Sequence, residues 1–213
     1  MTNVGAGAGS YEPRYRRVVA VEPSLTMIRQ RTPGAAPAVR ALASALPFRD
    51  ASFDAALAIL TIHHWTDRTQ GLGELARAAR RRVVILTHAW DLAASPFWLV
   101  DDYFPEILTL DRPIFPTLDE LRRSLGPLSV YDVPIPRDCS DGFLGAWWAR
   151  PEAYLDAGVR GAISSFAKLA DPAPGLERLR ADLASGAWER RHGAVRARES
   201  LDLGYRLVVA ESA

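Results

Sequence analysis

Short apolar runs, separated by glycine, proline and polar residues, dominate the first 87 residues of the chain. Runs of this kind, bounded by turn-forming residues, are typical of buried strands. Five such strands are predicted, at residues 2–4, 18–21, 37–42, 53–60 and 83–86. Apolar residues recur at helical spacing in two further segments, 25–31 and 68–80, which Ser24 and Asp67 can cap. Strands that alternate with helices predict an α/β protein with a Rossmann-like, doubly wound and mostly parallel sheet that has helices on both faces.

The remainder of the chain is more helical, which predicts helical insertions in the C-terminal half. Helices are expected at residues 116–126, 142–150 and 174–191, and strands at 129–136 and 202–210. The basic cluster Arg80–Arg82 is expected at the end of the helix over 68–80, where cations suit the helix dipole. An anion site is the alternative interpretation of that cluster.

Three glycines, Gly5, Gly7 and Gly9, follow the first predicted strand, and Glu22 closes the second. A glycine-rich turn lets a ligand approach the backbone closely, and a carboxylate at the end of the next strand can accept hydrogen bonds from two ribose hydroxyls. Ser10 stands where the dinucleotide fingerprint requires its third glycine, which disfavours a nicotinamide dehydrogenase.

Four stretches occur in a fixed order: Asn3–Gly9, Val19–Ser24 with Met27, Leu46–Phe48, and Phe53–Trp65. Together they resemble the class I S-adenosylmethionine-dependent methyltransferases of the small-molecule group called type 11. The resemblance implies an enzyme of class EC 2.1.1 that transfers a methyl group from S-adenosylmethionine to a small-molecule acceptor. It also implies one domain over 1–213, with a cofactor-binding half at about 1–87 and a substrate and helical half at about 88–213.

The resemblance assigns the loop and the ribose contact. Gly5, Gly7 and Gly9 would lie under the methionine part of the cofactor, and Glu22 would hold the ribose hydroxyls. Asn3 stands where the family usually has an acid that helps to bind the methionine ammonium. An asparagine can still accept a hydrogen bond there, but it supplies no charge.

The resemblance also assigns the adenine contacts. Pro23 and Met27 would flank the adenine ring, while Ala43 and Ser44 would meet its edge, mostly through their backbone. The family often has an aspartate near position 42 for the adenine amine, and this chain has Leu42.

The end of the fourth predicted strand carries the candidate chemistry. The resemblance implies that Leu60 and Thr61 face the methionine end and the reacting methyl. His64, and next to it His63, are candidate general bases, because a neutral imidazole can take a proton from a hydroxyl or an amine. The alternative is that these histidines only pack in the loop. Two adjacent histidines without a third ligand do not make a metal site, so no metal is expected.

Aromatic residues gather after the fifth predicted strand and again near residue 147, at Trp90, Phe97, Trp98, Tyr103, Phe104, Trp147 and Trp148. They can line a pocket for an apolar acceptor or form a hydrophobic core.

The chain starts two residues before Asn3, whereas members of the family usually carry a longer N-terminal segment that includes a covering helix. Two explanations stay open, a misassigned start or a truncated relative. The second leads to the alternative function, a catalytically silent S-adenosylmethionine-binding or scaffold protein.

Composition adds several exclusions. A formal net charge of +1 argues against a nucleic-acid partner bound through a bulk basic field. Cys139 is the only cysteine, so neither an internal disulfide nor a cysteine zinc cluster is expected. No apolar run is long enough to cross a membrane, and no signal peptide is apparent, so the simplest expectation is a cytoplasmic protein. The pattern predicts no oligomeric state.

Overall fold

The computed structural model describes residues 1–211, which divide into two compact units. The first, the sheet unit, contains Met1–Ala89, Phe115–Asp132 and the chain from Arg206 onward. The second, the helical unit, contains Trp90–Ile114 and Val133–Tyr205. The sheet unit therefore includes two segments beyond residue 87, Phe115–Asp132 and the segment that starts at Arg206.

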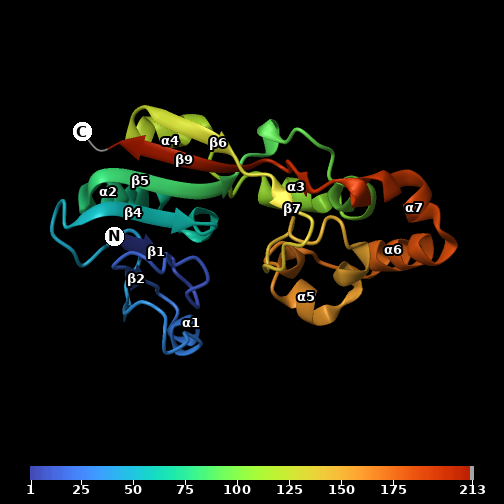
Figure 1. Cartoon of the computed structure of the whole chain (residues 1–213), viewed down its shortest axis with the longest axis horizontal. Coiled ribbons are helices and arrows are strands. Elements are labelled where there is room, and N and C mark those ends of the chain that lie inside the picture. The colour runs from blue at the N-terminus through green and yellow to red at the C-terminus, as the bar shows by residue number, and fades with distance from the viewer. Residues whose placement is uncertain (212–213) are drawn as a thin grey trace. The chain divides into compact units, whose positions relative to one another are not determined.

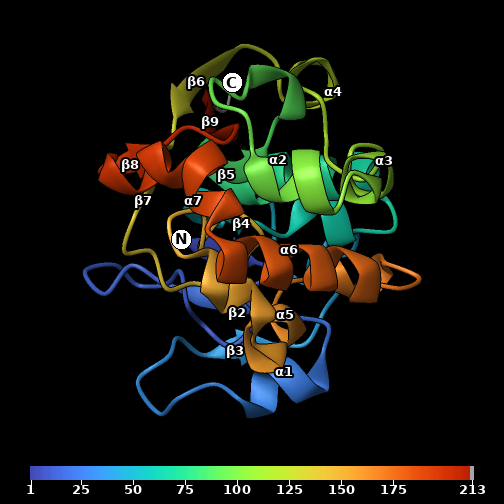
Figure 2. The same cartoon turned by 90° about the vertical axis from the view of Figure 1, so that its right-hand side faces the viewer.

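A seven-stranded sheet in the order β3-β2-β1-β4-β5-β9-β6 forms the centre of the sheet unit (Figures 1 and 2). Its strands are β1 (Thr2–Val4), β2 (Val19–Val21), β3 (Ala38–Val39), β4 (Phe53–Ile59), β5 (Ala79–His88), β6 (Leu128–Asp132) and β9 (Tyr205–Glu211). The pairs among β1 to β5 are parallel, whereas β6 and β9 are antiparallel. The predicted α/β class with a mostly parallel sheet is confirmed.

The basic cluster Arg80–Arg82 is in a strand, so its predicted position at a helix end is wrong. The helix stops at Ala78, and β5 starts at Ala79 because its ladder with β4 extends back to the Phe53–Ala79 pair. The three arginines are exposed, and Arg80 forms an ion pair with Asp54.

Three helices belong to the sheet unit: α1 (Leu25–Arg29), α2 (Arg68–Ala78) and α4 (Leu118–Leu125). Each is preceded by an N-cap residue whose side-chain oxygen accepts a hydrogen bond from a free amide of the first turn. Ser24 accepts from the Met27 amide, Asp67 from the Gln70 amide, and Thr117 from the Glu120 amide. The predicted caps Ser24 and Asp67 are thus confirmed. The structure also has a short 3₁₀ helix at Ile62–His64.

One apolar core joins β1, β2, β4, β5 and β9 to α2 and α4. Its completely buried side chains have at most 1% of their surface exposed, and they include Val4, Val21, Ile62, Leu72, Leu75, Ile85, Leu121 and Val208. α2 supplies two of these at helical spacing, Leu72 and Leu75. Burying each leucine or valine contributes about 1.5–3 kcal/mol relative to an exposed side chain.

The helical unit contains short elements around a second core. Its helices are α3 (Glu106–Asp111), α5 (Ala157–Gly161), α6 (Ala173–Ser185) and α7 (Ala187–His192), with short 3₁₀ helices at Trp90–Leu92, Pro151–Leu155, Phe166–Lys168 and Gly193–Ala197 and a π-helical turn at Leu99–Tyr103. A two-stranded antiparallel sheet pairs β7 (Ile135–Pro136) with β8 (Ser200–Leu201).

Most of the aromatic residues that the sequence offered for an acceptor pocket lie in this second core. Trp98, Tyr103, Phe104 and Trp148 each expose 3% or less of their surface. Trp98 packs edge-to-face on Trp188 with ring centroids 5.2 Å apart, and its indole N–H donates to the Trp148 carbonyl at 2.9 Å. These four side chains therefore act as core residues in this structure.

The strand expected over 202–210 is β9, which starts only at Tyr205. Three other elements predicted in the C-terminal half differ from the structure for local reasons. Residues 142–150 form turns, and the amide of Gly145 bonds to the Tyr205 hydroxyl instead of to a preceding turn of helix. The helix expected over 174–191 is two helices, because Gly186 takes a left-handed conformation with φ +71°. The strand expected over 129–136 breaks between β6 and β7 at Pro134, which has no amide hydrogen to donate.

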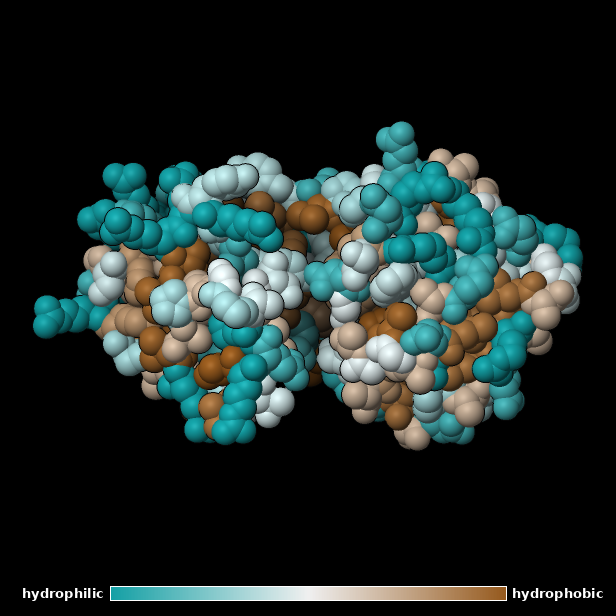
Figure 3. Space-filling model, turned by 60° about the horizontal axis from the view of Figure 1, so that its bottom comes forward, coloured by the Kyte–Doolittle hydropathy of each residue, from teal (hydrophilic) through white to brown (hydrophobic). Residues whose placement is uncertain are grey.

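Hydrophilic and apolar residues are interspersed over the face of the molecule drawn in Figure 3. Tyr15, Leu42 and Tyr131 are more than half exposed. Within residues 1–211, no helix combines the length and the apolar character that crossing a membrane requires.

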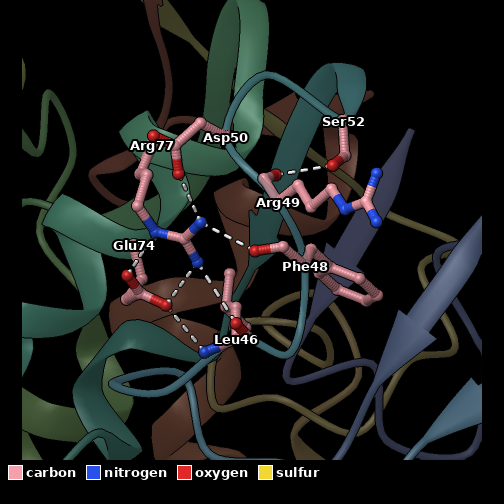
Figure 4. A network of polar contacts seen from close by, with 7 residues as sticks. All are labelled: Leu46, Phe48, Arg49, Asp50, Ser52, Glu74 and Arg77. Carbon is pink, nitrogen blue, oxygen red and sulfur yellow. Dashed lines mark hydrogen bonds and ion pairs between the residues drawn. The ribbon is translucent and has the colours of Figure 1, made fainter.

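A polar network fixes the loop that precedes β4 (Figure 4). The Arg77 guanidinium donates to the carbonyls of Leu46 and Phe48 at 3.2 and 2.7 Å, and to the carboxylates of Glu74 and Asp50 at 2.6–2.8 Å. Glu74 in turn accepts from the Leu46 amide at 2.8 Å. The hydrogen bond from Arg77 holds the pKa of Glu74 below its ordinary value, against the effect of burial.

Arg77→Met should lower the free energy of unfolding by about 2 kcal/mol at neutral pH, because it leaves Glu74 and two loop carbonyls without their donor. The lowered pKa of Glu74 stabilises the folded protein at pH values above the pKa of the unfolded chain, about 4.3. This stabilisation is lost as the pH falls through the lower pKa of the folded protein. The difference between wild type and Arg77→Met should therefore shrink below about pH 4. Urea unfolding of both proteins at neutral pH and below about pH 4 measures this difference. Arg122→Met, which breaks an exposed pair with Asp119, is the control and should change stability by less than about 0.5 kcal/mol.

Candidate cofactor site

The candidate residues gather at one edge of the sheet, where the parallel strands β1, β2 and β4 end. Val4 pairs with Val21, so the glycine loop after β1 and Glu22 after β2 leave the sheet side by side. Asn3 pairs with Leu57 of β4, whose end leads to Leu60. Ligands of open α/β sheets bind outside the carboxyl ends of the strands, so this edge is the expected place for a cofactor.

The glycine loop folds back over the end of β2. The amides of Gly5 and Ala6 both donate to the Val21 carbonyl, at 2.8 and 3.0 Å. Gly5, Gly7 and Gly9 have φ values of +74°, +52° and +99°, which L side chains rarely adopt. The three glycines thus permit a turn that other residues would strain.

Glu22 is 7% exposed, and its two carboxylate oxygens bond to two different segments. Oε2 accepts from the Gly7 amide at 2.8 Å, and Oε1 accepts from the Ser24 amide at 2.9 Å. Glu22 therefore joins the glycine loop to the start of α1. Since each carboxylate oxygen can accept more than one hydrogen bond, Glu22 keeps acceptor capacity for ligand hydroxyls.

The end of β4 lies against the glycine loop. A Cβ added to Gly5 would lie 1.9 Å from Thr61 Oγ1 and 2.7 Å from Thr61 Cβ. Leu60, directly before it, is a non-glycine residue in the left-handed region with φ +50°, and its amide bonds to the Leu86 carbonyl at 2.8 Å. Such backbone strain persists only where surrounding contacts impose it, and it concentrates at functional sites.

Asn3 is 2% exposed, and its side-chain oxygen Oδ1 has no hydrogen-bond partner in the structure. The same holds for Oγ1 of Thr87, a 2% exposed residue near the end of β5. A buried polar atom without a partner is costly, so each of these oxygens is suited to a donor that arrives with a ligand.

The expected adenine residues follow β2 and β3. Met27 approaches the loop, since a Cβ at Gly7 would lie 3.4 Å from its Cε. Pro23 is exposed next to Glu22, and Ala43 and Ser44 are half-buried between β3 and β4. The structure thus brings Met27 to the glycine loop, while the adenine roles of Pro23, Ala43 and Ser44 stay predictions.

The candidate bases lie in the 3₁₀ turn after Thr61. His63 is half-buried, and its ring stacks on Phe115 with centroids 4.4 Å apart. His64 is more exposed, with its ring centroid 3.9 Å from that of His63. His88, at the end of β5, contacts Phe115 with centroids 5.6 Å apart. No group of three or more potential metal ligands occurs among residues 1–211.

Sequence reasoning missed two residues that hold the glycine loop, Glu12 and Arg31. Arg31 donates to the Gly7 carbonyl at 2.9 Å and forms an ion pair with Glu12. No motif marks either residue, and 19 positions separate them. It also missed Phe115, which stacks on His63. Phe115 follows directly after Trp90–Ile114, the first segment of the helical unit, so the two rings are far apart in the sequence.

Comparison with known proteins identifies the family of the chain. A family model described as a methyltransferase domain matches residues 2–87. A solved structure assigned as a methyltransferase from an antibiotic biosynthesis pathway of Anabaena variabilis is 36% identical, with a TM-score of 0.88 over 98% of this chain and 90% of that one. No curated protein sequence matches the chain.

More distant structures share the fold. The YcgJ protein of Bacillus subtilis is 18% identical, with a TM-score of 0.56 over 99% of this chain and 90% of that one. Geranyl diphosphate C-methyltransferase of Streptomyces coelicolor, solved with Mg²⁺, geranyl diphosphate and S-adenosylhomocysteine, is 15% identical, with a TM-score of 0.51 over 100% and 70%.

The chain belongs to the class I S-adenosylmethionine-dependent methyltransferases. S-Adenosylmethionine is the cofactor of this family. The residues present fit it: Gly5, Gly7 and Gly9 leave the loop at the strand ends without side chains, Glu22 offers acceptors to hydroxyls, and Asn3 Oδ1 is a buried acceptor that lacks a donor.

Gly5→Ala should lower the free energy of unfolding by about 3 kcal/mol, because the new methyl overlaps Thr61 and the backbone is in the left-handed region. Gly73→Ala is the matched control. Gly73 lies in the exposed part of α2, with no atom within 4 Å of its added Cβ, and alanine there should raise stability by about 0.5–1 kcal/mol. Thermal and urea unfolding measure both variants. Equal stability of Gly5→Ala and wild type would contradict the close approach of the loop to β4.

Proposed function

We propose that this chain transfers the methyl group of S-adenosylmethionine to a small-molecule acceptor. The observation that carries the proposal is the joint position of Glu22 and the glycine loop, whose Gly7 amide bonds to the Glu22 carboxylate at 2.8 Å. A cytoplasmic location and the absence of a nucleic-acid partner belong to the same proposal.

The cofactor contacts follow from the residues at the strand ends. Glu22 accepts from the two ribose hydroxyls, and the loop of Gly5, Gly7 and Gly9 lies under the methionine part. Asn3 Oδ1 accepts from the methionine ammonium, which would satisfy an otherwise unpartnered buried atom. Asparagine supplies no charge there, so this contact is weaker than a carboxylate contact.

The remaining adenine and methyl contacts are part of the same proposal. Met27 and Pro23 flank the adenine, and the backbone of Ala43 and Ser44 meets its edge. Thr61, packed against Gly5, and the strained Leu60 face the methyl end.

The bound cofactor supplies an activated methyl group on a sulfonium, which is a good leaving group. The protein therefore has to position the acceptor and exclude water rather than activate the donor. A base is required only where the acceptor atom carries a proton at the operating pH. His64 is the proposed base, with His63 second, because both directly follow the residues at the end of β4.

The acceptor is proposed to be a small molecule for two reasons. The Anabaena variabilis protein, 36% identical over most of both chains, is assigned to an antibiotic biosynthesis pathway, and most antibiotics are themselves small molecules. In addition, the half-buried ring of His63, two residues after Thr61, stacks on Phe115 with centroids 4.4 Å apart, and we propose that a small acceptor contacts this pair of rings.

Glu22→Ala should weaken S-adenosylhomocysteine binding by about 2–4 kcal/mol, because it removes two hydrogen bonds to a charged acceptor. Calorimetric titration of the purified chain measures the affinity, with NAD as a ligand that should not bind. Glu22→Gln keeps the size of the side chain and should lose less than Glu22→Ala. Unchanged affinity in a folded Glu22→Ala variant would remove the ribose assignment.

His64→Asn should lower kcat for a hydroxyl acceptor by about 10²-fold at neutral pH, the lower range for a lost general base. The acceptor is first found by screening hydroxyl and amine compounds for turnover. The KM for S-adenosylmethionine should not change, and the acid limb of the pH–kcat profile should disappear. His63→Asn is the matched variant, for which we expect a smaller loss. Turnover by neither variant nor wild type, despite tight cofactor binding, would favour the catalytically silent alternative.

A further inference from the structure

The connection from β1 to β2 contains no helix. Parallel strands usually require a crossover of a dozen or more residues that includes a helix, whose first turn supports the loop before it. Here residues 5–18 cross as turns and coil. The backbone bonds within this loop are few, such as Gly9 to Ala6 at 3.0 Å and Arg16 to Pro13 at 3.2 Å.

A buried ion pair between Glu12 and Arg31 contacts this loop. The side chains of Glu12 and Arg31 are 9% and 7% exposed. The Arg31 guanidinium donates to Glu12 Oε1, to the Gly7 carbonyl at 2.9 Å and to the Ala36 carbonyl at 2.9 Å. Glu12 Oε2 accepts from the Ala36 amide at 2.7 Å. The pair therefore joins three segments: the glycine loop, the end of α1 and the turn before β3.

Gly7 is held on both sides of its Cα by opposite charges. Its amide donates to the Glu22 carboxylate, and its carbonyl accepts from the Arg31 guanidinium. These two groups belong to the two peptide planes that meet at Gly7, so the two bonds together restrain the orientation of both planes. Without them a glycine has more conformational freedom than any other residue.

The pair is better explained by positioning than by stability. Buried ion pairs contribute little net stability relative to apolar residues of similar volume, because both charges must be desolvated. Their geometry is nevertheless specific, and the planar fork of arginine can serve several acceptors at once. Arg31 uses that fork on a carboxylate and two backbone carbonyls.

We propose that Glu12 and Arg31 are positioning residues that hold the glycine loop in its cofactor-binding conformation, in place of a helix after the loop. The proposal rests on the proposed function, because it names residues that prepare the same cofactor site. Neither residue is assigned to contact the cofactor. Their effect acts through the Gly7 backbone.

The expected size of the effect follows from the fraction of molecules whose loop is ordered. Apparent affinity falls in proportion to the binding-competent fraction, so a loop that is ordered in about one molecule in ten binds about tenfold more weakly. Arg31→Met should therefore raise the Kd for S-adenosylhomocysteine by about tenfold or more. Arg31→Lys should recover only part of this loss, because an ammonium lacks the planar fork that serves three acceptors.

The test combines calorimetric titration with hydrogen exchange followed by mass spectrometry. In Arg31→Met, peptides from residues 1–17 should exchange faster, while peptides from β4 and β5 should keep the protection of the wild type. The double variant Glu12→Gln/Arg31→Met should be less destabilised than the sum of the single variants, since it buries no unpaired charge. Arg68→Met is the matched control, because Arg68 forms a partly buried pair with Glu120 in the same unit. It should alter neither the loop exchange nor the affinity.

Two results would overturn the proposal. One is a folded Arg31→Met variant with unchanged loop exchange and unchanged affinity. The other is an equal loss of affinity in Arg31→Met and Arg68→Met in proportion to lost stability, which would make the pair a general structural bond. Failure of the proposed function is seen separately, as wild-type protein that binds no S-adenosylhomocysteine. Loop exchange, which needs no ligand, still tests the positioning in that case.

Discussion

The close approach of the glycine loop to the end of β4 is the constraint on which the site depends. A single added carbon at Gly5 would lie 1.9 Å from Thr61 Oγ1, so the two chain segments meet with no room for a side chain between them. This contact ties the turn after β1 to the residues that follow β4, and with it the expected cofactor loop to the expected methyl end. The strained backbone of Leu60 lies in the same place, held by its bond to the Leu86 carbonyl.

Glutamates hold the irregular segments around this point. Glu22 accepts from the glycine loop, Glu12 from the turn before β3, and Glu74 from the loop before β4. Two of the three are paired with arginines that also bind backbone carbonyls, Arg31 and Arg77. In each case a carboxylate accepts a hydrogen bond from a backbone amide that has no partner in a sheet or a helix. Buried loop amides need such a partner, because an unpaired one is costly. The loops around the strand ends are thus ordered by side chains rather than by regular secondary structure.

The two units use their apolar residues in different ways. The core of the sheet unit is aliphatic and lies between parallel strands and two amphipathic helices. The helical unit has short helices that cannot bury much surface individually, and large rings fill its core instead, among them Trp98, Tyr154 and Trp188. Rings that fill a core are not available to bind an acceptor. The half-buried rings of the sheet unit, His63 and Phe115, are therefore better candidates for acceptor contacts.

The sequence alone was sufficient for the α/β class, the parallel strands, the caps at Ser24 and Asp67 and the methyltransferase family. Short apolar runs, cap residues and the ordered motifs are all local signals. The tertiary structure decided what depends on partners distant in the chain: the start of β5 within the arginine cluster, the core role of the aromatic residues, and the division of residues 174–191 at Gly186. It also decided the support of the glycine loop. In the sequence, Arg31 has no local feature that distinguishes it from the exposed arginines of the chain, because its function arises only when folding buries it against Glu12 and the Gly7 carbonyl.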